Sequence, residues 1–123
     1  MKKGIAALIG CLLVAGLLGG TFAQGKKVTF TGYLLDQMCG AGVKDTAKAA
    51  EHTKECALMD HCAAAGYGIF AEGKFITFDA EGSRKAKALF EKSKKEKDIQ
   101  VVAEGTLNGD VFTVSAIKEK GVK

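Results

Sequence analysis

Three of the four cysteines and both histidines of this 123-residue chain lie in the 24 residues from Cys39 to Cys62. Between Cys39 and Cys62 the chain carries His52, Cys56 and His61. In a small domain such a cluster of donor atoms usually marks either a metal site or a disulfide bond. Both would fix distant segments against one another, so the cluster constrains the fold more than any other feature.

The first 23 residues have the layout of a secretory signal peptide. Met1-Lys2-Lys3 is followed by an uncharged apolar run at residues 5–18, and small residues precede Gln24. A run of 14 residues is short for a bilayer core of about 30 Å. We therefore expect cleavage after residue 23 and a periplasmic or secreted protein that does not stay inserted in the membrane. Cys11 follows a lipoprotein-like Leu-Ile-Gly, but most of the apolar run comes after it, which disfavours lipidation.

Residues 24–123 then form a mature chain of 100 residues, enough for a single small domain. The 18 basic residues lose Lys2 and Lys3, so 16 basic residues face 14 acidic ones, a net charge of +2. This balance gives no support for nucleic-acid binding, and the expected partner is an unidentified protein or small ligand. Three cysteines remain, and an odd number cannot all pair within one chain.

The mature chain alternates between strand-like and helix-like composition. Residues 28–35 are β-branched and aromatic, as in a strand, whereas residues 45–65 are rich in Ala, Lys and Glu, as in one helix or two short ones. Asp45 and Gly66 are suited to the two ends of this helical segment. The remaining expected elements are strands at 67–70 and 74–78, a helix at 81–95, and strands at 99–105 and 111–117 joined by a turn at 108–110.

This order predicts a mainly β domain with helices, of the α+β class. Five short strands with a helix between the third and fourth fit a small OB-like barrel. The Cys/His segment would then be a helical insertion after the first strand. The alternative is another small α+β sheet with its helices on one face.

A resemblance to a protein family supports treating the cluster as a unit. The motif from Gly32 through Asp36 to Cys39, followed by His52, Cys56, Cys62 and then Gly66-Tyr67-Gly68, resembles a group of small exported bacterial proteins of unassigned function. The resemblance implies a small barrel in which the cysteines and His52 act together. It implies no particular activity.

The spacing supports a metal site made by Cys39, His52, Cys56 and Cys62. In a continuous helix His52 and Cys56 share a face, whereas Cys62 would need a bend near Asp60 to join them. A tetrahedral site with three thiolates and one imidazole suits zinc, with Zn–S distances of about 2.3 Å. A further Met59 ligand would favour Cu(I), so zinc is the preferred ion over copper.

The competing interpretation is a disulfide-stabilised binding module without metal. Cys39 can pair with Cys56 or with Cys62, and such a bond would stabilise the domain by about 2–4 kcal/mol. Asp36 is either an acceptor that orients a metal-bound histidine or the cap of a turn. Because no grouping of catalytic residues is evident, we expect no enzymatic activity and a structural or metal-handling role.

Overall fold

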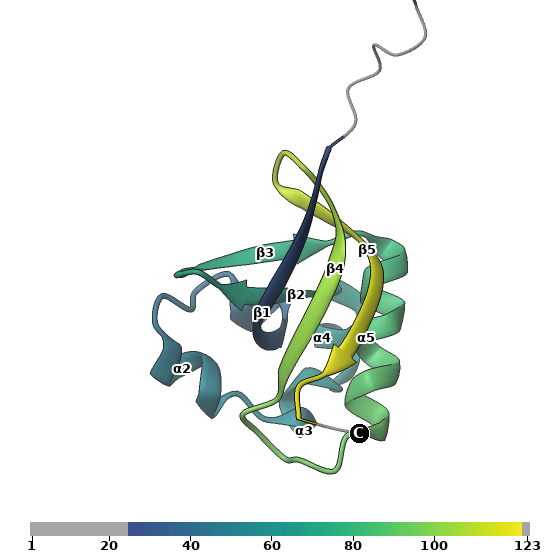
Figure 1. Ribbon diagram of the computed structural model, residues 1–123. Helices are drawn as coiled ribbons and strands as arrows, with labels where there is room; N and C mark the ends of the chain where they lie inside the picture. Colours follow the sequence, from purple (N-terminus) through teal and green to yellow (C-terminus); the bar gives the residue numbers. More distant parts are fainter. Residues whose placement is uncertain (1–24, 122–123) are drawn as a thin grey trace, which may run out of the picture.

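The computed structural model describes residues 25–121, so the expected signal peptide at 1–23 lies outside the described residues. It contains five strands and five helices within that range (Figure 1). The strands are β1 (Lys26–Asp36), β2 (Tyr67–Ala71), β3 (Lys74–Phe78), β4 (Gln100–Asn108) and β5 (Val111–Glu119). The helices are α1 (Gln37–Gly40), α2 (Thr46–Glu51), α3 (Lys54–Ala57), α4 (Asp60–Ala65) and α5 (Ala80–Lys92). The predicted α+β class, the helical segment after the first strand and the helix between the third and fourth strands are confirmed.

The strands form one mixed sheet in the hydrogen-bonded order β1-β2-β3-β5-β4. The β3–β5 pair is parallel and the other pairs are antiparallel. The long strand β1 pairs with β4 along its first part and with β2 along its last part, so the order of pairs returns to its starting strand. Its final residue, Asp36, lies opposite Tyr67 at the beginning of β2.

The main core lies between the sheet and α5. Helix α5 packs on β5 and β2 and buries Ala86 and Phe90. The ring of Phe90 lies 5.3 Å from that of Tyr67, and the rings of Phe30 and Phe112 meet edge to face at 5.1 Å. Aromatic pairs of this kind add to the stabilisation from area burial.

A smaller core cluster holds α2 against the end of β1. It consists of Leu35, Ala49 and Phe70. Because Ala49 belongs to α2, this contact fixes where the chain leaves that helix. The cluster therefore positions the residues that follow α2, including His52.

Two tight turns form at glycines, where the sequence predicted hairpins. The loop between β2 and β3 consists of Glu72 and Gly73, both with positive φ, as a type I′ hairpin requires. Gly109 between β4 and β5 has φ of 62°, which confirms the predicted hairpin and its glycine conformation.

The segment 45–65, expected to form one helix or two short ones, forms three short helices. His52 and Met59 both have extended backbone conformations, with ψ of 134° and 146°. Thr53 then caps α3 by accepting a hydrogen bond from the Cys56 backbone N–H. The predicted common helical face for His52 and Cys56 is therefore wrong, since local capping by Thr53 competes with a continuous helix.

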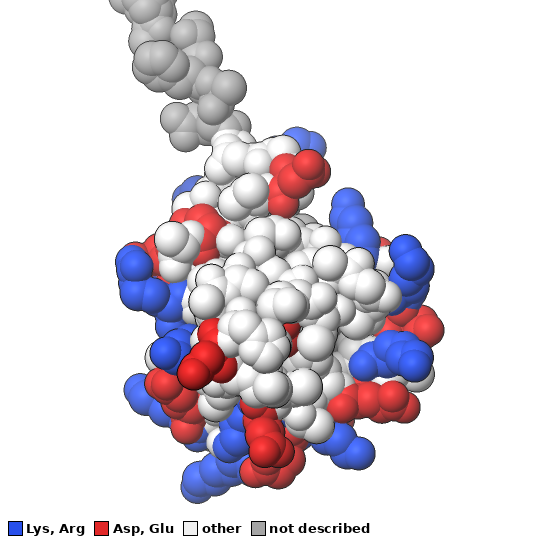
Figure 2. Space-filling model, turned by 180° about the vertical axis from the view of Figure 1, so that it is seen from behind, with Lys and Arg blue, Asp and Glu red and all other residues white. Residues whose placement is uncertain are grey.

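The face of the molecule opposite to the view in Figure 1 has a central area without charged side chains, surrounded by Lys, Arg, Asp and Glu (Figure 2). Within residues 25–121, no helix has both the length and the apolar character needed to cross a bilayer.

Candidate metal site

Asp36 is the central residue of the candidate site. It is the last residue of β1 and is fully buried. Its extended backbone makes it the N-cap of α1, and its Oδ2 accepts a hydrogen bond of 3.0 Å from the Cys39 backbone N–H. The short helix α1 was not predicted, although an acidic residue three positions before Cys39 has the spacing of an N-cap.

His52 approaches Asp36 from the linker between α2 and α3. Its Nε2 lies 2.6 Å from Asp36 Oδ1, and its side chain is only 7% exposed. The extended conformation of His52, rather than a helical one, allows the ring to reach the end of β1. Asp36 thus both caps a turn and orients a histidine, the two roles that the sequence left as alternatives.

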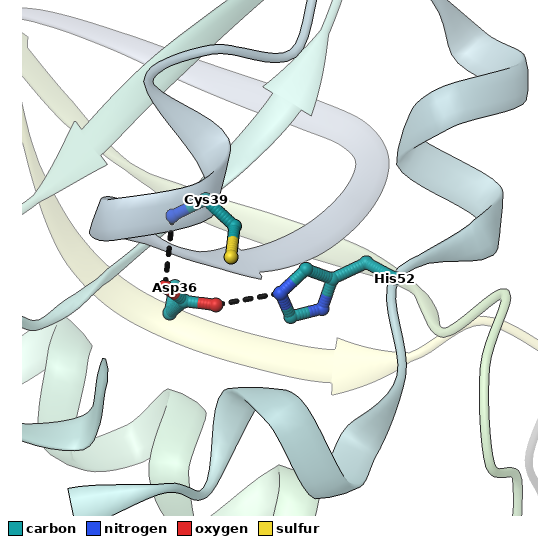
Figure 3. Close-up of side chains that lie close together, drawn as sticks. All are labelled: Asp36, Cys39 and His52. Carbon is teal, nitrogen blue, oxygen red and sulfur yellow. Dashed lines mark hydrogen bonds and ion pairs between the residues drawn. The ribbon is translucent and has the colours of Figure 1, made fainter. Parts of the chain in front are cut away.

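Cys39 completes a group of three different donor types. The sulfur of Cys39, a carboxylate oxygen of Asp36 and a ring nitrogen of His52 all lie within 4.8 Å of one another. The three side chains converge from the end of β1, from α1 and from the α2–α3 linker (Figure 3). Three ligand atoms at such distances are close enough to hold a metal ion.

The buried carboxylate is stabilised in its charged form. Burial acts to raise the pKa of Asp36, but the hydrogen bond with His52, the backbone N–H of Cys39, the charge of His52 and Cys62 together lower it below 3.8. A buried carboxylate needs such partners, because losing hydration without compensation would favour its neutral form. Asp36 therefore presents an ionised oxygen to the space that it shares with Cys39 and His52.

The surroundings of Cys39 and Cys62 raise the pKa of both thiols and so favour their protonated forms. Partial burial is the largest cause that raises the pKa of Cys39 to about 11, the negative charge of Asp36 is the second, and the proximity of Cys56 and Cys62 adds to both. Burial and the Asp36 charge also raise the pKa of Cys62. Reactive thiols have lowered pKa values, so this environment does not favour a nucleophilic or redox role. A bound cation would reverse the effect, because it stabilises the thiolate that ligates it.

The other two predicted ligands lie near the group but outside it. Cys62, on α4, is 4% exposed, and Cys56, on α3, is half-buried. Both are close enough to Cys39 to raise its pKa. In the described part of the chain all three cysteines are free. The structure therefore joins Cys39 and His52 of the predicted set, adds Asp36, and places Cys56 and Cys62 as neighbours.

Two other residues from the helical stretch lie at the surface. Met59, the potential copper ligand, is 45% exposed, and His61 is also exposed. Neither belongs to the group formed by Asp36, Cys39 and His52.

The 2.6 Å contact between Asp36 and His52 is a hydrogen-bond distance and suits a metal-free state. Zinc bonds to nitrogen and oxygen are about 2.0–2.2 Å, so tetrahedral coordination would hold these atoms about 3.3 Å apart. A modest separation of the two side chains would therefore admit an ion between them.

Comparison with known proteins gives no information about the function of this site. No family model, curated protein or solved structure matches this chain.

Proposed function

We propose that this protein is an exported domain that binds zinc through Asp36, Cys39 and His52, in a structural or metal-handling role. Cys62 or Cys56 would complete a tetrahedral set. The observation that carries the proposal is the convergence of three potential ligand atoms within 4.8 Å. A buried carboxylate, an imidazole and a thiol from three separate segments form an arrangement that local capping alone does not require.

The mixed donor set favours zinc over copper. Zinc accepts carboxylate oxygen, imidazole nitrogen and thiolate sulfur as ligands. Cu(I) prefers thiolates and thioethers, and the buried carboxylate of Asp36 is a poor ligand for it. The exposure of Met59, at 45%, also gives no sign of a thioether directed into the group.

We further propose that the sheet is an OB-like barrel. The ring of strand pairs, the parallel β3–β5 pair and the position of α5 between β3 and β4 support this architecture. In such a barrel the segment between β1 and β2, which carries α1 to α4, is a long connection outside the strands. That is where a binding site would be added to the scaffold.

Export follows from the sequence of residues 1–23 and is part of the proposal. Mass spectrometry of the protein recovered outside the cytoplasm should show a chain that begins at or near Gln24. A chain that retains Met1, or that carries lipid on Cys11, would exclude this processing.

Native mass spectrometry after anaerobic purification provides the main test of zinc binding. We expect one zinc ion per chain, removable by a chelator, and no loss of two daltons from a disulfide. A protein that holds no zinc under these conditions contradicts the proposal. A two-dalton loss without metal would instead support the disulfide-stabilised module.

A matched pair of histidine variants tests the residues. His52→Ala should lower both the zinc content and the melting temperature of the zinc-loaded protein, because metal binding is linked to folding. His61→Ala removes the exposed histidine of the same segment and should leave the zinc content unchanged. Full zinc content in His52→Ala would show that the ion is held elsewhere.

A further inference from the structure

Helix α4 brings a further cysteine to the candidate site. It packs against α1 and β1, the elements that carry Cys39 and Asp36, whereas the principal neighbour of α3 is α4. A continuous helix would have turned Cys62 away from the other donors. The extended conformation of Met59 interrupts the helical stretch three residues before Cys62, so α4 takes a new direction there.

The side chain of Cys62 contacts two of the three residues in the group. Its thiol donates a hydrogen bond to the Asp36 carboxylate and is in hydrogen-bonding contact with the Cys39 thiol. Cys62 is 4% exposed, and its neighbours Asp36 and His52 are similarly buried. A donor atom of Cys62 is therefore already directed at the carboxylate and the thiol that would hold the ion.

Cys56 has a different position. It is half-buried and acts on Cys39 and Cys62 through its charge, and within residues 25–121 its side chain forms no hydrogen bond with either thiol or with Asp36. Its helix, α3, is held elsewhere, because the Lys54 backbone N–H donates a hydrogen bond of 2.7 Å to the Glu96 carbonyl oxygen. Bringing Cys56 into the group would require α3 to move, whereas Cys62 requires only an adjustment of its side chain.

We infer that Cys62 is the fourth zinc ligand and that the ion is a closed, structural one, an inference that rests on the proposed zinc site. The ligands are then one carboxylate, one imidazole and two thiolates, and Cys56 stays a free thiol beside them. Structural zinc sites are closed by four protein ligands, whereas catalytic sites keep one position open. Of the two roles left open above, the four-ligand set selects the structural one.

The segment between β1 and β2 is one that a structural ion would stabilise. Its four helices have only 4 to 6 residues each, and helices of this length are not stable by themselves. The smaller core cluster includes only α2 among them. An ion bound to the end of β1, to α1, to the α2–α3 linker and to α4 would join four separate segments, and its binding energy would add to the stability of the fold.

The test replaces zinc by Co(II) in the mature protein and uses a matched pair of cysteine variants. Each bond between Co(II) and a thiolate contributes charge-transfer absorption in the near ultraviolet, so the spectrum counts the sulfur ligands. Cys62→Ser should lose one of the two sulfur contributions and bind zinc about 100-fold more weakly or worse, since even the loss of a residue that only orients a ligand costs 10–100-fold. Cys56→Ser should keep both contributions and the wild-type zinc affinity.

The opposite pattern, with a sulfur contribution lost in Cys56→Ser and none lost in Cys62→Ser, would overturn the inference and leave zinc binding itself intact. Full sulfur absorption in both variants would also overturn it. A wild-type protein that binds neither zinc nor Co(II) would contradict the proposed function instead. If Cys62→Ser does not fold, Cys56→Ser still decides, because two sulfur contributions in that variant can come only from Cys39 and Cys62.

Addition of azide to the Co(II)-loaded wild-type protein tests whether the site is closed. Azide binds to a metal ion that has an open position or a bound water, and it then changes the visible spectrum. With four protein ligands in place the spectrum should stay unchanged as azide is added. A spectral change that saturates with azide would show an open position and overturn the structural assignment.

Discussion

Asp36 Oδ1 and His52 Nε2 lie 2.6 Å apart although 16 positions separate the two residues in the sequence. The contact joins the end of β1 to the linker between α2 and α3. Because Asp36 is fully buried, the interaction takes place away from solvent, where charged hydrogen bonds are stronger than at the surface. It holds a carboxylate and an imidazole at one place even without a metal.

Replacement of Asp36 by asparagine should destabilise the metal-free protein by about 2 kcal/mol or more, because a charged hydrogen bond in the interior is lost. Urea unfolding in the presence of chelator measures this free energy. Asp45→Asn is the matched control: Asp45 caps α2 from an exposed position, and asparagine caps helices as well as aspartate does. Similar stability losses in the two variants would contradict a special role for Asp36.

Acid should weaken the metal-free protein through the same residue. The pKa of Asp36 is lowered from 3.8 in the folded state, so the unfolded chain takes up its proton first as the pH falls. The stabilisation is therefore present above about pH 4 and is lost as the pH falls through the folded-state pKa. Urea midpoints between about pH 5 and pH 2 should fall more steeply for the wild type than for Asp36→Asn. Parallel curves would show that Asp36 does not contribute.

Gly109→Val should destabilise the domain by about 1 kcal/mol or more, because φ at this position is 62° and a β-branched side chain is strained there. Ala116→Val places the same side chain at an exposed position of β5, where valine is favoured, and should cause no loss. Thermal melts of both variants provide the comparison. An unchanged melting temperature for Gly109→Val would argue against the hairpin.

Tyr67→Phe should cost about 1 kcal/mol or more. The Tyr67 hydroxyl donates a buried hydrogen bond of 2.7 Å to the Ala57 carbonyl oxygen, which ties α3 to β2. Burial raises the pKa of Tyr67 to about 12, so the hydroxyl keeps its proton across the neutral range. Tyr33→Phe, at a half-buried position of β1, is the control in urea unfolding. Equal losses would mean that the bond to Ala57 contributes nothing specific.

The local features that the sequence predicted are those set by neighbouring residues. Asp45 caps α2, Gly66 with φ of 98° ends α4, and Gly109 forms the last hairpin, each at its predicted position. These caps and turns depend on single residues with strong conformational preferences. They can therefore be predicted from the sequence without knowledge of the fold.

Within the segment 45–65 the local sequence did not predict where one helix ends and the next begins. Its composition favours helix throughout, but Thr53 caps α3, and His52 and Met59 adopt extended conformations. A capping side chain within a helix-forming stretch offers the backbone hydrogen bonds that compete with those of a continuous helix. Which of the two sets forms depends on the packing around the segment.

The sequence by itself determined the class of the fold, the succession of its strands along the chain and the interval from Cys39 to Cys62 that carries the donor atoms. Only the tertiary structure decided which donors meet. Packing of Leu35, Ala49 and Phe70 sets α2 against β1 and brings His52 to Asp36. That contact depends on side chains far apart in the chain, and no periodicity along the sequence encodes it, because it arises from the burial of apolar surface between separate elements.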